Sequence, residues 1–445
     1  MANARLTALE ALRRVNEDDG YSNLVLDQAL KQAGLDERDR SLASILFYGV
    51  LEHRITLDWV ISKYSSKPIS KVSPKVRDIL RMGIYQLAYL DKVPPSAAVN
   101  ESVKLTRVCG QERASGFVNG VLRSFARSHC DLQLPNEREL PFAYRSIRYS
   151  CPEWLIRMWN KAYGEENTLG LLASLEGRPP LAARINTCKG NDRDLLEKWS
   201  KEGIKVREVE GIPHAVCLEQ TGSIEQLSAF QRGEFHVQDL ASQIACWVLG
   251  PQPGERVIDV CSAPGGKAFT MAQMMENRGQ LLSFDLYPAK VRLIEEGAKR
   301  LGLPIIQAAV RDARNDPEFV PKANRVLCDA PCSGLGIIRR KPEIRYKNSN
   351  TLDSLPDLQY LILCKSSELV EKGGILLYST CTLNPKENGK VADKFLKGYP
   401  EFVPYPIKLP KWVIRHDWEP SHQLTLLPHL HGTDGFFLSA FQRLR

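Results

Sequence analysis

One stretch near the middle of the chain constrains the fold most strongly, because it joins a strand, a glycine-rich turn and a helix. The apolar run Arg256-Val-Ile-Asp-Val-Cys261 predicts a buried strand, and the turn Cys261-Ser-Ala-Pro-Gly-Gly-Lys267 follows it directly. From about residue 241 onward, strand and helix candidates alternate, which is typical of a parallel sheet covered by helices. We therefore predict an α/β Rossmann-like domain over residues 241–445.

The glycine-rich turn also indicates what this domain binds. Its glycines let backbone amides approach a ligand, and the start of the following helix favours an anion. The turn matches neither the dinucleotide motif nor the phosphate-binding loop of nucleoside triphosphatases. Asp285 ends the next predicted strand, 280–285, where a carboxylate can accept hydrogen bonds from ribose hydroxyls. The order of these features predicts a cofactor that contains a nucleoside.

Two cysteines lie where later strands of this sheet are expected to end. Asp329-Ala-Pro-Cys332 follows the strand predicted at 325–328, and Ser379-Thr-Cys381 follows the strand predicted at 375–378. A thiolate can add to carbon 6 of cytosine and leave again, which activates carbon 5 as a nucleophile. The residues themselves do not decide which thiol attacks. Lys267 is a candidate for stabilising the thiolate, whereas we expect Cys328 and Cys364 to be core residues.

Further strands are predicted at 305–310 and 435–441, the latter as an antiparallel edge strand beside 423–427. Residues 1–128 show only helical periodicity and predict a domain of six to eight helices. We expect a linker at 129–150 and a small α+β module at 151–240, which serves either as a nucleic-acid platform or as an extension of the next domain.

Composition excludes several classes of protein. The 445 residues include 25% charged and 43% hydrophobic residues, as in ordinary globular proteins. The N-terminal segment carries charges where a signal peptide is apolar, and no run is long enough to span a membrane, so we expect a cytoplasmic protein. The eleven cysteines form no Cys-x-x-Cys pair, which argues against a disulfide framework or a zinc site, and we assign no metal.

The charge distribution allows a polyanionic partner. The net charge is +8, and residues 1–150 hold 22 Lys and Arg against 17 Asp and Glu. A denser basic stretch, Arg339-Arg340-Lys341 followed by Arg345 and Lys347, adjoins the Cys332 motif. A run of charges is usually solvated surface, but its position favours contact with RNA phosphates, with Tyr346 stacking on a base.

The motifs together resemble the bacterial 16S rRNA cytosine-5 methyltransferase family RsmB, also called Fmu or Sun. The resemblance covers nearly the whole chain. The helical region is similar to the NusB-type RNA-binding domain, and residues 230–239 resemble the family's entry into its catalytic part. The most specific pieces are the 261–267 turn, the 329–334 motif, and 378–382 followed by Pro385 and Glu387-Asn388.

The resemblance implies S-adenosylmethionine as the cofactor and free small-subunit 16S rRNA as the substrate of a monomeric enzyme. It implies that Cys381 forms a covalent adduct with a cytosine of the 967 type and that Cys332 assists release of the methylated RNA. Asp329 is expected to serve the cytosine as well as the cofactor. The residues implied to contact the cofactor are Cys261, Ser262, Ala263, Pro264, Gly265, Gly266, Lys267, Asp285, Asp312 and Asp329. Ser262 stands where the family often has alanine.

Two alternatives remain open. The chain could be an RNA-binding or assembly factor with a vestigial catalytic half, although the intact turn and both thiols argue against this. It could instead methylate tRNA or DNA. Only 64 residues follow Cys381, which leaves little room there for a large DNA-recognition domain.

Overall fold

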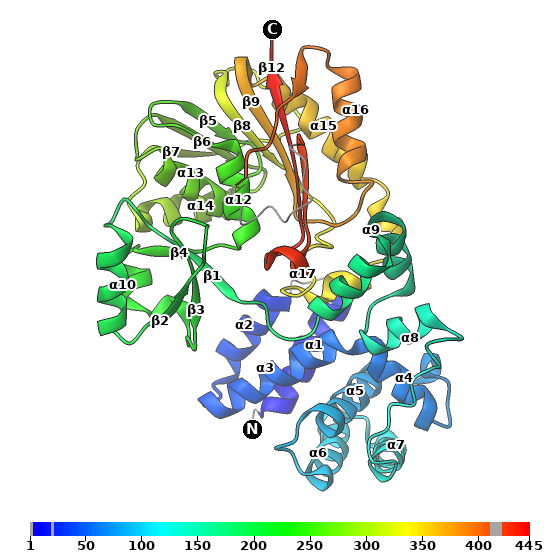
Figure 1. Cartoon of the computed structure of the whole chain (residues 1–445). Coiled ribbons are helices and arrows are strands. Elements are labelled where there is room, and N and C mark those ends of the chain that lie inside the picture. The colour runs from blue at the N-terminus through cyan, green and yellow to red at the C-terminus, as the bar shows by residue number, and fades with distance from the viewer. Residues whose placement is uncertain (1–2, 19–21, 410–420) are drawn as a thin grey trace. The chain divides into compact units, whose positions relative to one another are not determined.

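The computed structural model describes residues 3–18, 22–409 and 421–445. The chain divides into two compact units (Figure 1). The helical unit contains residues 1–176 together with 338–348, and the α/β unit contains residues 177–337 and 349–445.

The helical unit contains the periodic segments expected from the sequence. Its seven N-terminal α-helices, within the described residues, are α1 (Ala4–Asp18), α2 (Ser22–Ala33), α3 (Glu37–Glu52), α4 (Arg54–Tyr64), α5 (Pro74–Tyr89), α6 (Pro95–Val108) and α7 (Ser115–Arg127). Two short 3-10 helices, η1 (Ile69–Lys71) and η2 (Glu112–Ala114), join them. In α7 the residues Val118, Val121, Leu122 and Phe125 are buried at helical spacing. This confirms the apolar face predicted there.

Helical structure continues beyond residue 128. The segment expected to be a linker contains α8 (Pro141–Arg148), and α9 (Glu153–Ser174) follows it. Gly164, with a φ of 80°, interrupts α9 with a kink. Both helices belong to the helical unit, and the α/β unit begins at residue 177. Pro141 occupies the first turn of α8, where proline is favourable, so the segment expected to be a linker is partly helical.

The segment 338–348 packs in the helical unit although its sequence neighbours belong to the α/β unit. It contains η4 (Pro342–Tyr346). Arg345 is 1% exposed and donates hydrogen bonds to the carbonyl oxygens of Glu52, Tyr149 and Ser150. These bonds hold the segment on the helices.

The α/β unit begins with a four-stranded antiparallel sheet of order β2-β3-β1-β4. Its strands are β1 (Leu181–Ile185), β2 (Lys205–Glu208), β3 (Ala215–Glu219) and β4 (Phe235–Val237), and its helices are α10 (Asp192–Lys201), η3 (Ile224–Gln226) and α11 (Ser228–Gln231). This is the α+β module expected from the sequence. The prediction missed β4, which has only three residues.

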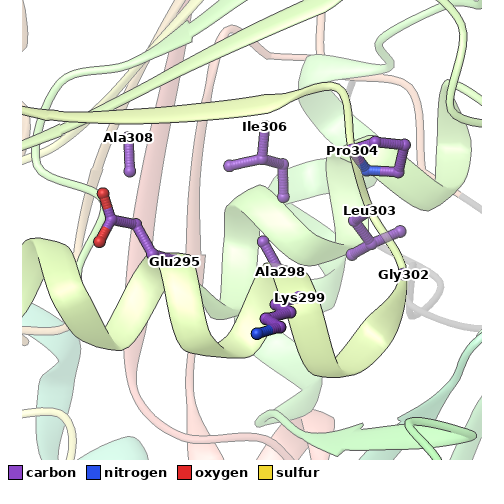
Figure 2. Close-up of a pocket in the computed structure, with 8 residues that line it drawn as sticks. All are labelled: Glu295, Ala298, Lys299, Gly302, Leu303, Pro304, Ile306 and Ala308. Atoms are coloured by element: carbon purple, nitrogen blue, oxygen red, sulfur yellow. The ribbon is translucent and has the colours of Figure 1, made fainter.

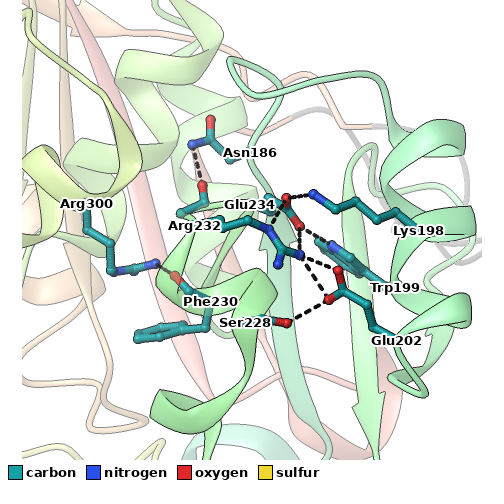
Figure 3. Close-up of polar contacts among 10 residues, drawn as sticks. Asn186, Lys198, Trp199, Glu202, Ser228, Phe230, Arg232, Glu234 and Arg300 are labelled. Carbon is teal, nitrogen blue, oxygen red and sulfur yellow. Dashed lines mark hydrogen bonds and ion pairs between the residues drawn. The ribbon is translucent and has the colours of Figure 1, made fainter.

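Polar contacts in this module centre on the buried carboxylate of Glu234 (Figure 3). It accepts hydrogen bonds from Arg232, Lys198 and the Trp199 indole. Arg232 also contacts Glu202. Although burial opposes the shift, the hydrogen bonds from Arg232, Lys198 and Trp199 lower the pKa of Glu234 to about 2.

A second set of contacts joins this module to the large sheet domain. Asn186 donates to the carbonyl oxygens of Gly233 and Leu301. Arg300 donates to the carbonyl oxygen of Phe230 (Figure 3). A Cβ on Gly233 would lie 2.1 Å from the Arg300 carbonyl oxygen. The close approach therefore requires glycine at position 233.

The large sheet has eight strands, seven of them in the order β10-β12-β9-β8-β5-β6-β7, with β11 paired to β12. They are β5 (Arg256–Asp259), β6 (Gln280–Asp285), β7 (Ile306–Val310), β8 (Ala323–Asp329), β9 (Val370–Thr380), β10 (Phe402–Pro404), β11 (Gln423–Leu426) and β12 (Phe436–Arg443). Strands β5 to β9 are mutually parallel. The antiparallel pairing of β12 with β11 is confirmed, but β12 also pairs with β9 and is not an edge strand.

Helices cover both faces of this sheet, giving the three layers expected of a Rossmann-like domain (Figure 1). One face packs against α12 (Leu240–Leu249), α13 (Gly266–Met274) and α14 (Pro288–Leu301), and the other against α15 (Leu355–Ser367) and α16 (Gly389–Gly398). Consecutive strand residues point to opposite cores, as Val257 and Ile258 do. The remaining short helices are η5 (Ser349–Leu352) and α17 (Pro428–His431).

A surface pocket of about 380 Å³ lies between α14 and the edge strand β7 (Figure 2). Its lining residues are Glu295, Ala298, Lys299, Gly302, Leu303, Pro304, Ile306 and Ala308. None of them is a predicted site residue. The candidate site lies instead at the strand ends.

Candidate active site

The predicted cofactor and catalytic residues meet at the carboxyl ends of the parallel strands. The 261–267 turn follows β5, Asp285 ends β6, and Asp312 follows β7. Asp329 ends β8, and Cys381 follows β9 directly. Strands β6 and β7 lie on one side of β5 and strands β8 and β9 on the other, so the turn sits where the strand order reverses. This is the position where open α/β sheets bind ligands.

Backbone hydrogen bonds fix the shape of the 261–267 turn. Ser262 donates its backbone N–H to the carbonyl of Phe284 at 2.7 Å, and Gly265 donates to the carbonyl of Ser262 at 2.8 Å. Gly265 has a φ of 106°, and a Cβ there would lie 2.5 Å from the ring of Phe269. Glycine is therefore required at 265, and α13 begins immediately after it with its first N–H groups free of intrahelical partners.

Two acidic residues near the turn differ in their hydrogen-bond partners. The carboxylate of Asp285 is buried and accepts from the backbone N–H groups of Ala263 and Tyr287 at 3.3 Å each, which leaves acceptor capacity. Asp312 forms a two-pronged ion pair with Arg314, with oxygen–nitrogen distances of 2.6 Å and 2.9 Å. The hydrogen bonds from Arg314 lower the pKa of Asp312.

Asp259, at the end of β5, was not predicted as a site residue. It is 1% exposed, and no hydrogen-bond donor satisfies its carboxylate oxygens. Burial, together with the nearby charge of Asp329, raises the pKa of Asp259 to about 7. The sequence carried a signal, since Asp259 is the one acidic residue of the apolar run that was expected to be a buried strand.

Asp329 is held from two sides. Lys267 Nζ donates to Asp329 Oδ2 at 2.6 Å, and Ser379 Oγ donates to Asp329 Oδ1 at 2.7 Å. Although burial lowers the pKa of Lys267, the charge and hydrogen bond of Asp329 raise it above its ordinary value. Lys267 thus stays charged beside Asp329. The sequence suggested Lys267 as a group that stabilises a thiolate, but in the structure its ammonium group pairs with Asp329. Ser379, which was not predicted as a site residue, is the second group that holds Asp329.

The two expected thiols face each other. Cys332 Sγ and Cys381 Sγ are 3.2 Å apart. Strands β8 and β9 are neighbours in parallel register, with Asp329 opposite Ser379, so the residues just past each strand end must meet. Hydrogen bonding with Cys381, followed by burial, raises the pKa of Cys332 well above its ordinary value. Cys328 and Cys364 are buried in the core, as expected.

The basic stretch belongs to the helical unit, where Arg339, Arg340 and Lys341 are partly buried. Tyr346 corrects one expectation: its hydroxyl donates to the carbonyl of Leu51 at 2.7 Å, and the Arg54 guanidinium covers its ring at 5.0 Å. The ring packs within the helical unit and is not available as a platform for a base.

Within residues 3–18, 22–409 and 421–445, no helix has the length and apolar character needed to cross a membrane. Within the same residues, no group of three or more His, Cys, Asp and Glu side chains could hold a metal ion.

A doubly wound sheet with a glycine-rich turn at its switch point, and with acidic residues beside that turn, defines the class of α/β enzymes that bind a nucleoside-containing cofactor. The sequence profile of the 16S rRNA methyltransferase RsmB/F family matches residues 246–442, that of the NusB family residues 2–127, and that of the ferredoxin-like domain of RsmF/B-type methyltransferases residues 151–225.

Full-length relatives agree with the profiles. The chain is 38% identical over 442 residues to the probable ribosomal RNA small subunit methyltransferase B of Bacillus subtilis, covering 98% of both chains. It is 31% identical over 400 residues to ribosomal RNA small subunit methyltransferase B of Escherichia coli, covering 89% of this chain and 90% of that protein. The chain belongs to the 16S rRNA methyltransferase RsmB/F family. It is therefore an rRNA methyltransferase that depends on S-adenosylmethionine.

Solved structures support the fold. The crystal structure of PH0851 has a TM-score of 0.82 at 26% identity, covering 99% of this chain and 98% of that one. A methyltransferase homolog protein from Pyrococcus horikoshii has a TM-score of 0.59 at 27% identity, covering 68% of this chain and 99% of that one. The site residues fit the cofactor, because the turn presents the N-terminal N–H groups of α13 and the carboxylate of Asp285 beside it keeps acceptor capacity for ribose hydroxyls.

Proposed function

We propose that this enzyme methylates carbon 5 of a cytosine of the 967 type in 16S rRNA through a covalent adduct with Cys381. The observation that carries the proposal is the pair of thiols at 3.2 Å, next to the Asp329–Lys267 ion pair and beside the cofactor turn. Carbon 5 of cytosine is a poor nucleophile until another group adds to carbon 6. A cysteine thiolate is the side chain best suited to add and later leave.

The state of Cys332 favours Cys381 as the attacking group. Hydrogen bonding with Cys381 and burial raise the pKa of Cys332 well above its ordinary value, so this thiol stays protonated at neutral pH and is a poor nucleophile. The negative charges of Glu387 and Asp329 raise the pKa of Cys332 further. We therefore assign the attack to Cys381 and the release step to Cys332, whose sulfur lies 3.2 Å from that of Cys381.

The proposed reaction begins when the Cys381 thiolate adds to carbon 6, which places the electron pair of the ring double bond on carbon 5. Bound S-adenosylmethionine would supply a methyl group to carbon 5 from its sulfonium, and its sulfur would leave as a neutral thioether. Water takes the carbon 5 proton, and the electrons of the carbon–hydrogen bond restore the ring double bond and expel Cys381 as a thiolate. The base must leave its stack for this, which costs a few kcal/mol and least in an unpaired loop.

Residues of the site divide between cofactor and base. We assign Cys261 to Lys267, Asp285, Asp312 and Asp259 to the cofactor, with Asp285 accepting from ribose hydroxyls. Asp329 serves the base as well, because each of its oxygens receives one donor and keeps a further lone pair. Arg339, Arg340 and Lys341 contact RNA phosphates in this proposal. The enzyme acts as a cytoplasmic monomer on free small-subunit rRNA.

The test is transfer of labelled methyl groups from S-adenosylmethionine to 16S rRNA, tRNA and DNA in parallel, followed by location of the label on the base. We expect 16S rRNA to be methylated at carbon 5 of one cytosine. Cys381→Ala should lower transfer by at least about a thousandfold, as expected when a nucleophile is removed. Cys332→Ala should accumulate a protein–RNA species that survives denaturation.

Cys364→Ala serves as the control, because this thiol lies in the core away from the strand ends. It should retain transfer and trap no RNA. Full transfer by Cys381→Ala would refute the assignment of the nucleophile, and a freely dissociating product from Cys332→Ala would refute the release role.

A further inference from the structure

The loop after β9 contains a carboxylate to which the proposed steps assign no role beyond its negative charge near Cys332. Glu387 is 0% exposed and lies six residues after Cys381, just before α16. A buried charge is costly unless hydrogen bonds or an opposite charge compensate it. The groups that compensate Glu387 come from both cysteine loops and from α15.

Four donors surround the Glu387 carboxylate. Ser333 approaches with its backbone N–H at 2.8 Å and its hydroxyl at 2.5 Å. Gln359 Nε2 and Asn384 Nδ2 donate at 2.9 Å each. Each carboxylate oxygen thus accepts two hydrogen bonds, and two of the four donors belong to the residue next to Cys332.

The hydrogen-bond directions in this cluster form one chain that ends on Glu387. The backbone N–H of Asn384 donates to Thr382 Oγ1, so the Thr382 hydroxyl is free to donate to Ser333 Oγ. Ser333 Oγ in turn donates to Glu387 Oε1. Only an acceptor without N–H or O–H groups satisfies the end of such a chain, and an ionised carboxylate is that acceptor.

The loop that carries Cys381 has its own supports. Thr380 Oγ1 donates to Asn388 Oδ1 at 2.7 Å, and Asn388 Nδ2 donates to the carbonyl of Thr382 at 2.9 Å. Gly336 donates its backbone N–H to the carbonyl of Cys381 at 3.0 Å. Loss of the Glu387 carboxylate would therefore release Ser333 and its neighbour Cys332 first, and leave Cys381 in place.

From this arrangement we propose that Glu387 is a positioning residue for the release step, which holds Cys332 against Cys381 by binding Ser333. The inference rests on the proposed roles of the two cysteines. It assigns Glu387 no contact with the cofactor or the base. Its effect falls on the breaking of the bond between Cys381 and carbon 6, not on the formation of that bond.

Glu387→Gln is the sharpest variant, because it keeps the shape of the side chain and replaces one oxygen with an NH2 group. That group would face a donor from Ser333, Gln359 or Asn384, whichever way the amide turns. We expect single-turnover methyl transfer to 16S rRNA to stay within about threefold of the unmodified enzyme. Steady-state turnover should fall about tenfold or more, corresponding to one disrupted charge-assisted hydrogen bond.

The readout that separates positioning from general damage is the covalent protein–RNA species on a denaturing gel. Glu387→Gln should accumulate it, as Cys332→Ala does, while the dissociation constant for S-adenosylmethionine measured by calorimetry stays unchanged. Ser333→Ala removes one of the four donors and should give the same signature more weakly. Exposed Glu318 of the same unit provides the matched control Glu318→Gln, which should behave as the unmodified enzyme.

The outcomes separate the two proposals. If Cys332→Ala traps RNA but Glu387→Gln does not, the role of Glu387 is wrong and the proposed function stands. If Cys332→Ala itself traps nothing, the proposed release role fails first. Should Glu387→Gln fail to fold, Ser333→Ala decides: trapped RNA supports the inference, and loss of single-turnover transfer without trapping overturns it.

Discussion

At the scale of single residues, buried carboxylates differ by the groups around them. Asp259 lacks donors and its pKa is raised to about 7, whereas the pKa of Glu234 is lowered to about 2. A raised pKa, as for Asp259, is expected where a ligand completes the surroundings of the carboxylate. A lowered pKa, as for Glu234, is expected where the protein itself supplies all the donors. Burial alone therefore does not identify a functional acid.

Glu234 leads to a prediction about pH. Because its pKa in the folded state lies below the ordinary value of 4.5, the ionised group stabilises the fold above about pH 4.5, and this stabilisation is lost as the pH falls toward 2. Glu234→Gln should lower the free energy of unfolding at pH 7 by about 2 kcal/mol, a value reduced for the exposure of Lys198 and Arg232.

Urea unfolding at pH 7, 5 and 4 checks this, with Glu197→Gln, an exposed helix pair with Lys201, as the control. The difference between the variant and the unmodified protein should shrink as the pH falls through 4.5. A difference that stays constant with pH would show that the lost interaction does not depend on the charge of Glu234.

At the scale of elements, backbone contacts align three segments beside the cysteines. Gly435, just before β12, donates its N–H to the carbonyl of Gly336, and Gly336 donates to that of Cys381. A Cβ on Gly336 would lie 1.9 Å from the Gly435 carbonyl oxygen. The start of β12 thus packs against both cysteine loops, which is possible only because β12 lies inside the sheet next to β9.

Gly336→Ala should therefore disturb the site without touching its side chains. We expect a loss of about 2 to 3 kcal/mol of stability, as for overpacking of a closely packed region, and a fall in methyl transfer of about tenfold or more. Gly222→Ala is the control, because a Cβ there meets no atom within 4 Å. Chemical unfolding and the methyl-transfer assay measure the two effects. Wild-type values for Gly336→Ala would mean that the close contact relaxes at little cost.

At the scale of the whole molecule, residues 338–348 belong to the helical unit, although the segments before and after them belong to the α/β unit. Arg345, buried and bonded to three carbonyl oxygens of that unit, anchors this return. The stability of the helical unit therefore depends on residues that lie far along the chain.

Arg345→Met should lower the protection of α3, α8 and residues 149–152 in hydrogen exchange by about tenfold or more, because three buried carbonyl groups lose a charged donor. Protection of the parallel strands β5 to β9 should not change. Lys347→Met, an exposed position on the same segment, is the control. Equal loss of protection in both units would contradict a role confined to the helical unit.

Local patterns explain how much of this molecule could be predicted. Apolar runs marked β5, β6 and β8 within a few residues, and the glycines of the 261–267 turn marked the ligand-binding end of the sheet. The short strands β4 and β10 were missed because three residues carry too little periodicity. The partner of Lys267, the packing of Tyr346 and the donors of Glu387 were not predictable, because each depends on residues distant in sequence.

The sequence by itself determined the order of helices and strands, the cofactor turn and the presence of two cysteines at strand ends. These features depend on hydrophobic periodicity and on the preferences of turn residues, which act between neighbours in the chain. Only the tertiary structure decided that β12 lies inside the sheet, that residues 338–348 join the helices, and that Cys332 faces Cys381 with Glu387 bonded to Ser333. Those contacts join segments from 49 to 321 residues apart. Such contacts form through strand pairing and burial, which no local window of sequence contains.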